Sequence, residues 1–145
     1  MQDRGWIDLH SHILPQLDDG SDSVEMSLAM LYQMAEQGVD VVCATSHYYA
    51  KHSSIPAFCE RRAEALERLS AVLTEDLPWV LPAAEVAYFP RMEEQDLTPL
   101  CIQGTRTLML EMPFADWTGL QLETVEALVL DCRYDVVLVH PERFC

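Results

Sequence analysis

The chain has 145 residues, a length that corresponds to one domain with a buried core. Half of the residues are hydrophobic and 23% are charged, as in ordinary globular proteins, and no apolar run approaches the roughly 20 residues that a membrane-spanning helix needs. The formal net charge of −15 argues against a nucleic-acid partner, because nucleic-acid backbones are bound by Lys and Arg. The acidic excess indicates either a solvated acidic surface or carboxylates gathered around bound cations.

The first predicted elements are a strand and an amphipathic helix. Residues 6–9 form a short strand candidate, and Asp22 is then predicted to cap a helix with Glu25 as its capping-box partner. Gly38 is expected to end this helix. Its apolar face comprises Val24, Leu28, Leu31 and Ala35.

The same alternation continues through the middle of the chain. Residues 39–44 predict a buried strand, and Pro56 suits the first turn of a second helix that ends near Asp76. Residues 79–81 begin a third strand, whereas residues 86–105 are irregular. The apolar residues of the second helix are Leu66, Leu69, Val72 and Leu73.

The last third of the chain predicts a fourth strand at residues 107–110 and a fifth at residues 135–139. Strands separated by helices form βαβ units, so the fold class is α/β with a parallel sheet, either open or closed into a barrel. The helix between these strands is predicted to bury one face, made of Leu122, Val125, Leu128, Val129 and Cys132.

Histidine and glutamate residues follow every predicted strand. Because the carboxyl ends of parallel strands meet on one face, these side chains are expected to converge. Clustered carboxylates and imidazoles without cations would lose solvation, and divalent metals remove that problem. Four of the five histidines belong to the set, and the fifth, His52, is predicted to be exposed in a polar loop. The set is His10, His12, His47, Glu85, Glu111 and His140.

The spacing of His10 and His12 favours a shared metal ion. Alternate residues of an extended segment point the same way, so both imidazoles can reach one ion. Asp18-Asp19-Gly20 follows, and this loop can bring one carboxylate back toward the metals. Mixed nitrogen and oxygen ligands suit manganese, iron, cobalt or zinc.

The five cysteines indicate neither a disulfide framework nor a zinc-thiolate site, because their number is odd and no pair has Cys-x-x-Cys spacing. Cys43 and Cys132 lie in apolar stretches and are predicted to be small core residues. No cysteine is followed six residues later by Arg, so a cysteine-based tyrosine phosphatase is excluded.

Several motifs, in order and spacing, resemble the tyrosine-protein phosphatases of the polymerase-and-histidinol-phosphatase (PHP) superfamily, which occur in bacterial capsule and exopolysaccharide clusters. The resemblance implies a seven-stranded distorted (β/α) barrel with three divalent metals, usually manganese, of which this chain would hold about the first five β/α units. The motifs are IDLHSHILP at residues 7–15, DDGS at 18–21, ATSH at 44–47, AEV at 84–86, LE at 110–111 and VHPERF at 139–144.

The resemblance also implies roles for individual residues. His10 and His12 would bind the first metal, and Glu85 would bridge the first and second. Glu111 and His140 would complete the second, and Asp19 and His47 would serve the third. Asp19 and Arg143 are the implied catalytic residues, with Arg143 contacting the phosphoryl group; the alternative for Arg143 is a surface salt bridge with Glu142.

The implied substrate is a protein phosphotyrosine on the tyrosine-rich tail of a kinase that controls polymer export. A cytoplasmic location is expected, since residues 1–6 lack the basic and apolar regions of a secretory signal. Alternatives are another PHP phosphoesterase such as a histidinol phosphatase, an inactive metal-binding remnant, and a metal amidohydrolase.

The resemblance implies two further strands and a late Asp-x-His motif, so the chain is expected to be a fragment, a truncated product or half of an assembly, such as a homo-oligomer. Residues 1–145 would form a single domain. An open parallel sheet of this kind would expose an unpaired edge and apolar faces.

Overall fold

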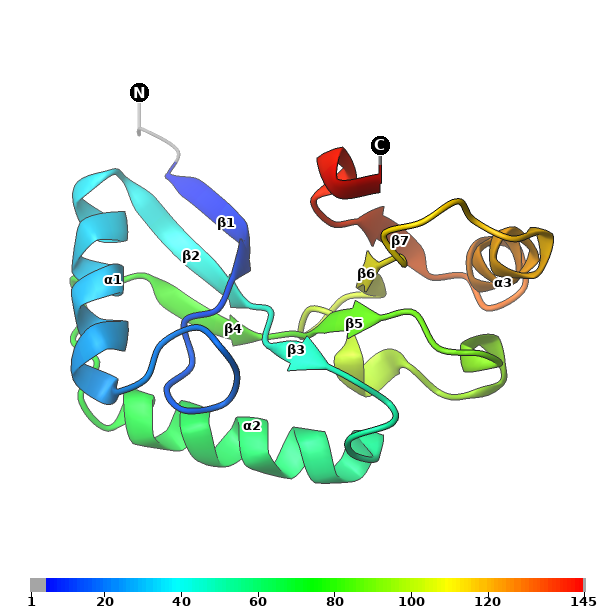
Figure 1. Cartoon of the computed structure of the whole chain (residues 1–145). Coiled ribbons are helices and arrows are strands. Elements are labelled where there is room, and N and C mark those ends of the chain that lie inside the picture. Colours follow the sequence, from blue (N-terminus) through cyan, green and yellow to red (C-terminus); the bar gives the residue numbers. More distant parts are fainter. Residues whose placement is uncertain (1–4, 145) are drawn as a thin grey trace.

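The computed structural model describes residues 5–144, and this part of the chain contains seven β-strands and three α-helices (Figure 1). The strands are β1 (Trp6–Ser11), β2 (Val39–Ala44), β3 (His47–Tyr48), β4 (Trp79–Pro82), β5 (Glu85–Ala87), β6 (Thr107–Glu111) and β7 (Asp135–Leu138). The helices are α1 (Val24–Glu36), α2 (Ile55–Ser70) and α3 (Gly119–Leu130). Short 3-10 turns lie at Met92–Glu94, Thr98–Leu100 and Pro141–Phe144.

All strand pairs are parallel, which confirms the predicted α/β class. The strands form two sheets, of order β1-β2-β4 and β3-β5-β6-β7. The sheets adjoin where β2 leads into β3 and β4 into β5, and backbone bonds cross both breaks. Ala83 N–H donates to the Ala44 carbonyl at 3.1 Å, and Glu85 N–H donates to the Ser46 carbonyl at 2.9 Å.

The five predicted strands are all present, but β3 and β5 were not predicted. They contain two and three residues, too few for an alternating pattern to reveal them. In consequence His47 and Glu85 do not lie in loops after a strand: each begins a short strand of its own, and the two are register partners. His10 likewise lies within β1.

Helix α1 buries the predicted face, but its predicted cap is wrong. Leu31 is fully buried, and the other three residues of that face pack against the same core cluster. The N-cap is Ser23, whose side chain accepts the Met26 N–H at 3.1 Å, one residue later than the predicted Asp22. Gly38 follows the helix with φ +81°, a conformation that favours glycine.

Helix α2 begins as predicted and ends earlier. Ser54 caps it, and Pro56 lies in its first turn. The helix stops at Ser70, because the chain then turns toward β4; Val72 is therefore beyond the helix and exposed. The predicted end near Asp76 is wrong by nearly two helical turns, at about 3.6 residues each.

Helix α3 does not bury the whole predicted face. Leu128 and Thr124 are buried, whereas Leu122 and Val129 are exposed. The helix carries apolar residues on several sides, so periodicity alone could not select the packed one. Of the two cysteines predicted to be core residues, Cys43 is buried, and Cys132 is half-buried just after the helix.

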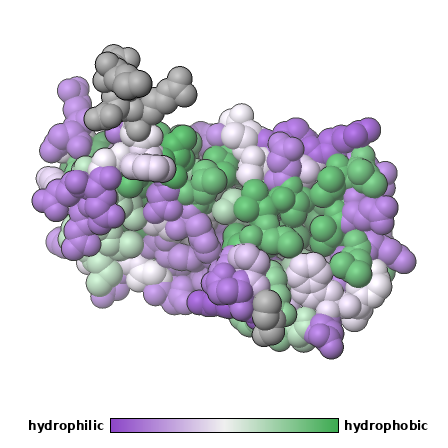
Figure 2. All heavy atoms as spheres, turned by 90° about the horizontal axis from the view of Figure 1, so that it is seen from above, coloured by the Kyte–Doolittle hydropathy of each residue, from purple (hydrophilic) through white to green (hydrophobic). Residues whose placement is uncertain are grey.

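β1 and β7 are terminal strands of their sheets, and each leaves an open edge among the described residues (Figure 1). Trp6 and Ile7 on β1 and Val137 on β7 are exposed apolar residues, which confirms the expected open edge with apolar surface. Figure 2 shows a broad hydrophobic area on the face seen from above. None of the described helices combines the length and hydrophobicity that crossing a bilayer requires.

Candidate metal centre

The carboxyl ends of the strands bring all six predicted histidine and glutamate residues to one place. His10 comes from β1 and His12 from the segment just after it, while His47 and Glu85 start the paired strands β3 and β5. The remaining two, Glu111 and His140, lie at the end of β6 and directly after β7. The predicted convergence is confirmed.

Glu85 lies at the centre of the cluster with only 1% of its surface exposed. One carboxylate oxygen is 2.8 Å from His10 Nε2 and 3.0 Å from His12 Nε2. The same oxygen is 3.6 Å from His47 Nδ1. The other oxygen is 2.7 Å from His140 Nε2, so one buried carboxylate contacts four imidazoles.

Glu111 completes the cluster, and its pKa shifts in the opposite direction to that of Glu85. Its carboxylate lies 3.0 Å from His140 Nε2. Burial alone would raise the pKa of Glu85, but hydrogen bonds with His10, His12 and His140 hold that pKa below its usual range. Burial and the neighbouring Glu85 raise the pKa of Glu111. Two close carboxylates with divergent pKa values indicate a site where added positive charge is stabilising.

Asp18 is a site residue that the sequence reasoning missed. One carboxylate oxygen accepts the His47 backbone N–H at 3.0 Å and lies 2.8 Å from His12 Nδ1. The other accepts the Gly20 N–H at 2.9 Å. The hydrogen bond with Asp18 is the main cause that raises the pKa of His12 to about 10, followed by the bond with Glu85. Asp18 therefore fixes the orientation of the His12 ring, with Nε2 facing Glu85.

The second aspartate of the motif faces outward. The Asp19 side chain is 81% exposed, with one oxygen 3.3 Å from His47 Nε2. The motif also requires its glycine, because a Cβ at Gly20 would lie 2.4 Å from the Cβ and carbonyl oxygen of His12. The pair of aspartates signalled a site in the sequence, but nothing in the sequence indicated which carboxylate turns inward.

The donor set fits divalent metal ions. Nitrogen and oxygen atoms lie within 4.8 Å of one another in three overlapping groups: His12 with Asp18, Asp19 and His47; His10 with His12 and Glu85; and His47 with Glu85 and Glu111. Nδ1 of His47 and Nδ1 of His140 are buried without a hydrogen-bond partner among the described residues. Unpaired imidazole nitrogens beside carboxylates are the ligands that manganese, iron, cobalt and zinc accept.

Arg143 lies at the mouth of this centre. It lines a cavity of about 460 Å³ together with His10, Gly20, Glu85 and His140. Its guanidinium is exposed, 5.9 Å from the Phe114 ring centroid, and among the described contacts it forms no ion pair with Glu142. His140 adopts φ +30°, a strained conformation of the kind found at functional sites.

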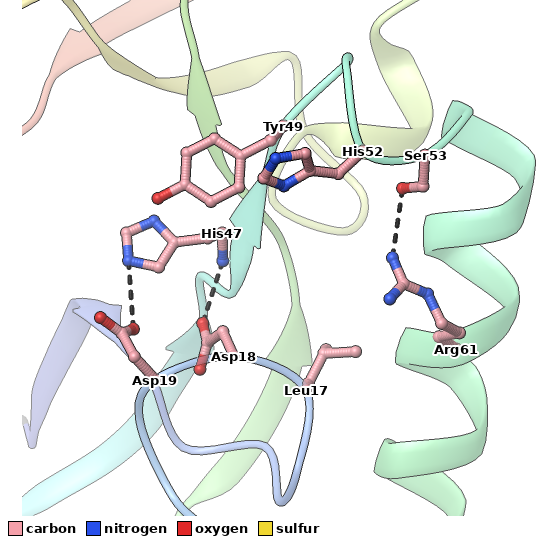
Figure 3. A pocket seen from close by; sticks show the side chains of 8 residues that line it. All are labelled: Leu17, Asp18, Asp19, His47, Tyr49, His52, Ser53 and Arg61. Carbon is pink, nitrogen blue, oxygen red and sulfur yellow. Dashed lines mark hydrogen bonds and ion pairs between the residues drawn. The ribbon is translucent and has the colours of Figure 1, made fainter.

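A second cavity has a volume of about 380 Å³, and its lining residues are drawn in Figure 3. Asp19 and His47 line both cavities. The Tyr49 ring stacks on His47 with centroids 5.4 Å apart, and His52 meets the edge of Tyr49 at 5.4 Å. His52 is exposed, as predicted. Arg61 of α2 closes the opposite side.

Comparisons with known proteins place this geometry in a family. The model of a family described as "Capsular polysaccharide synthesis, CpsB/CapC" matches residues 6–145. The tyrosine-protein phosphatase YwqE of Bacillus subtilis is 32% identical over 94% of this chain and 54% of its own length. The tyrosine-protein phosphatase CpsB of Streptococcus pneumoniae is 49% identical over 95% of this chain and 57% of its own length.

A solved structure agrees with the sequence matches. It belongs to a study of YwqE from Bacillus subtilis and CpsB from Streptococcus pneumoniae, described as unique metal-dependent tyrosine phosphatases. The fold matches with a TM-score of 0.75 and 29% identity, covering 95% of this chain and 56% of that one. The chain thus spans about half the length of the relatives it matches.

Proposed function

Since the chain belongs to the CpsB/CapC family of capsular polysaccharide synthesis, we propose that it carries the metal centre of a phosphatase that hydrolyses protein phosphotyrosine. The observation that carries the proposal is the buried Glu85 carboxylate in contact with four imidazoles. The YwqE and CpsB relatives are tyrosine-protein phosphatases, which favours phosphotyrosine over a small phosphate monoester such as histidinol phosphate.

We propose His10, His12, Asp19, His47, Glu85, Glu111 and His140 as the metal ligands, with manganese as the favoured ion. Divalent cations in such a site supply Lewis acidity and neutralise the charge of a transferring phosphoryl group. Glu85 is the central ligand, because its two oxygens face opposite halves of the cluster. The exposed side chain of Asp19 can approach an ion next to His47 without moving the core.

Asp18 and Arg143 have the remaining proposed roles. Asp18 keeps a proton on His12 Nδ1 and thereby leaves Nε2 free for an ion. Arg143 faces the cavity of the centre without a carboxylate partner among the described residues, so its guanidinium can pair with phosphoryl oxygens. We propose Arg143 as the residue that orients the phosphoryl group.

The finer identity of the substrate is a further part of the proposal. We propose the tyrosine-rich tail of a kinase that controls polysaccharide export, since the family description is capsular polysaccharide synthesis.

We also propose that the two parallel sheets form the first part of a PHP-type (β/α) barrel, with residues 1–145 in one domain. The open edges at β1 and β7 and the greater length of the relatives support this architecture.

The direct test is phosphate release from a phosphotyrosine peptide in the presence of Mn²⁺. We expect release from this peptide and not from histidinol phosphate, and we expect Glu85→Gln to abolish both turnover and bound metal. Glu36→Gln, an exposed glutamate on α1, removes the same charge and is the matched control. Metal content is measured by mass spectrometry of the purified protein.

Three outcomes separate the alternatives. Faster turnover of histidinol phosphate would transfer the proposal to a small-molecule phosphatase. Bound metal without turnover of either substrate would leave a metal-binding module. If Arg143→Ala kept full activity toward the peptide, the phosphoryl role of this arginine would be refuted, as the amidohydrolase alternative predicts.

A further inference from the structure

The cavity between Asp19 and α2 lies next to the metal centre, so a substrate peptide whose phosphotyrosine enters the centre can extend into it. The two cavities share Asp19 and His47 as lining residues, so they adjoin at these side chains. A residue next to the phosphotyrosine would therefore place its side chain over Tyr49, His52 and Arg61. Resting on the proposed function, we propose that this cavity is a subsite for an acidic side chain that flanks the phosphotyrosine.

Arg61 is the charge that makes the subsite selective. Its guanidinium donates to the neutral hydroxyl of Ser53 at 3.1 Å, and it forms no ion pair within residues 5–144. The other two arginines of α2 have structural partners. Arg62 donates to the carbonyls of Ala83 and Pro99, and Arg68 donates to a loop carbonyl.

The position of Arg61 on its helix brings this charge to the cavity. Helical side chains point back toward the N-terminus, and the Arg61 side chain reaches back to Ser53, just before the N-cap residue Ser54. The N-terminal end of α2 carries the positive end of the helix dipole, which adds to the attraction for an anion. No acidic side chain lies in that first turn.

The carboxylates on the inner wall do not offset this charge. Both oxygens of Asp18 are occupied by protein donors, namely the ring of His12 and the backbone N–H groups of His47 and Gly20. Asp19 faces His47 and, under the proposed function, a cation. The unmatched charge that faces a ligand in this cavity is therefore positive, although the whole chain carries −15.

The aromatic wall suits the stem of such a side chain. The ring of Tyr49 stacks on His47 at 20° between planes, and the ring of His52 stands against it at 60°. In Figure 3 these rings lie on one side of the cavity and Arg61 on the other. The methylene groups of a glutamate can contact the rings while its carboxylate reaches the guanidinium.

Equilibrium binding of non-hydrolysable peptides tests the subsite. Two fluorescent peptides carry a difluoromethylphosphonate analogue of phosphotyrosine. The analogue is flanked by glutamate in one peptide and by glutamine in the other. With the full chain and Mn²⁺, we expect the glutamate peptide to bind about fivefold more tightly at low salt, as for a partly exposed ion pair. The preference should shrink in high salt, because screening weakens such pairs.

Variants locate the preference. Arg61→Gln should bring the two affinities to within about twofold, whereas Arg133→Gln, which removes the same charge from an exposed residue after α3, should keep the preference. Circular dichroism verifies that both variants fold. Equal affinities in the parent chain, a preference that survives Arg61→Gln, or no binding of either peptide would each overturn the proposal.

Turnover separates this proposal from the proposed function. Phosphate release from phosphotyrosine peptides is measured independently of the binding preference. Release at equal efficiency from glutamate-flanked and glutamine-flanked peptides would refute the subsite while the phosphatase function stands. A binding preference that depends on Arg61, without release of phosphate from any peptide, would refute the phosphatase function and leave the subsite.

Discussion

Replacing Asp18 with asparagine should weaken metal binding without unfolding the protein. The two carboxylate oxygens serve three donors, which are His12 Nδ1 and the backbone N–H groups of His47 and Gly20. An asparagine keeps the shape but offers only one acceptor oxygen, so its NH₂ group must face at least one of these donors. The change also removes the charge that holds the proton on His12 Nδ1.

The expected magnitude follows from the number and kind of bonds lost. A hydrogen bond to a charged group contributes about 1.5–3 kcal/mol, and the partners behind metal ligands affect metal affinity by about tenfold to one hundredfold. These two ranges agree, because tenfold corresponds to about 1.4 kcal/mol. Asp18→Asn should therefore weaken Mn²⁺ binding by about tenfold or more.

Competition with a fluorescent chelator measures the Mn²⁺ affinity, and circular dichroism reports the fold. Asp22→Asn is the matched control, since this exposed aspartate lies in the same segment and loses the same charge. The reasoning would be refuted if Asp18→Asn and Asp22→Asn had the same Mn²⁺ affinity as the parent chain. If Asp18 acts only through His12, Asp18→Asn should weaken Mn²⁺ binding less than His12→Ala does.

Three other predictions concern the metals, the core and a thiol. Removing bound metal with a chelator should lower the melting temperature by at least about 5 °C, and Mn²⁺ should restore it; an unchanged melting curve would count against a metal in the native state. Leu31→Ala should lower the free energy of unfolding in urea by about 2–5 kcal/mol, because Leu31 is fully buried. Leu120→Ala, at a residue that is 64% exposed, should lower it by less than about 0.5 kcal/mol. Similar losses for the two variants would contradict the packing described above. Burial raises the pKa of the Cys101 thiol to about 11, so at pH 8 iodoacetamide should modify Cys59 about tenfold faster than Cys101. This difference should persist until the pH approaches the Cys101 pKa. Peptide mass mapping gives both rates, and equal rates would show that Cys101 is accessible as a thiolate.

The sequence predicted the convergence of the histidine and glutamate side chains well because these residues have regular positions in the chain. His10 and His12 are two residues apart on an extended segment, and Glu111 and His140 each follow an apolar run. Parallel strands separated by helices bring such positions to one face whatever the details of packing. The open sheet edge was expected from the family resemblance, which implies two further strands, and not from the apolar runs themselves.

The short strands and the helix caps were less accessible to sequence reasoning. β3 and β5 exist because the backbone of His47 and Glu85 finds partners on strands more than 20 residues distant, which no local pattern encodes. The Asp22 cap was wrong because Asp22 and Ser23 are both good capping residues. Only the path of the preceding loop selects between them.

What the sequence by itself determined is the set of histidine and glutamate side chains that converge and the edge at which they meet, since strand order and residue type suffice for both. What only the tertiary structure decided is which groups face which. Asp18 turns inward and Asp19 outward because the backbone of Ser21 bonds back to His12 and the N–H of His47 approaches from another strand. Arg61 meets the neighbouring cavity for a similar reason: α2 packs across the sheet so that its N-terminal end lies beside the metal centre. Such contacts join segments distant in the chain, so no spacing within the sequence could have specified them.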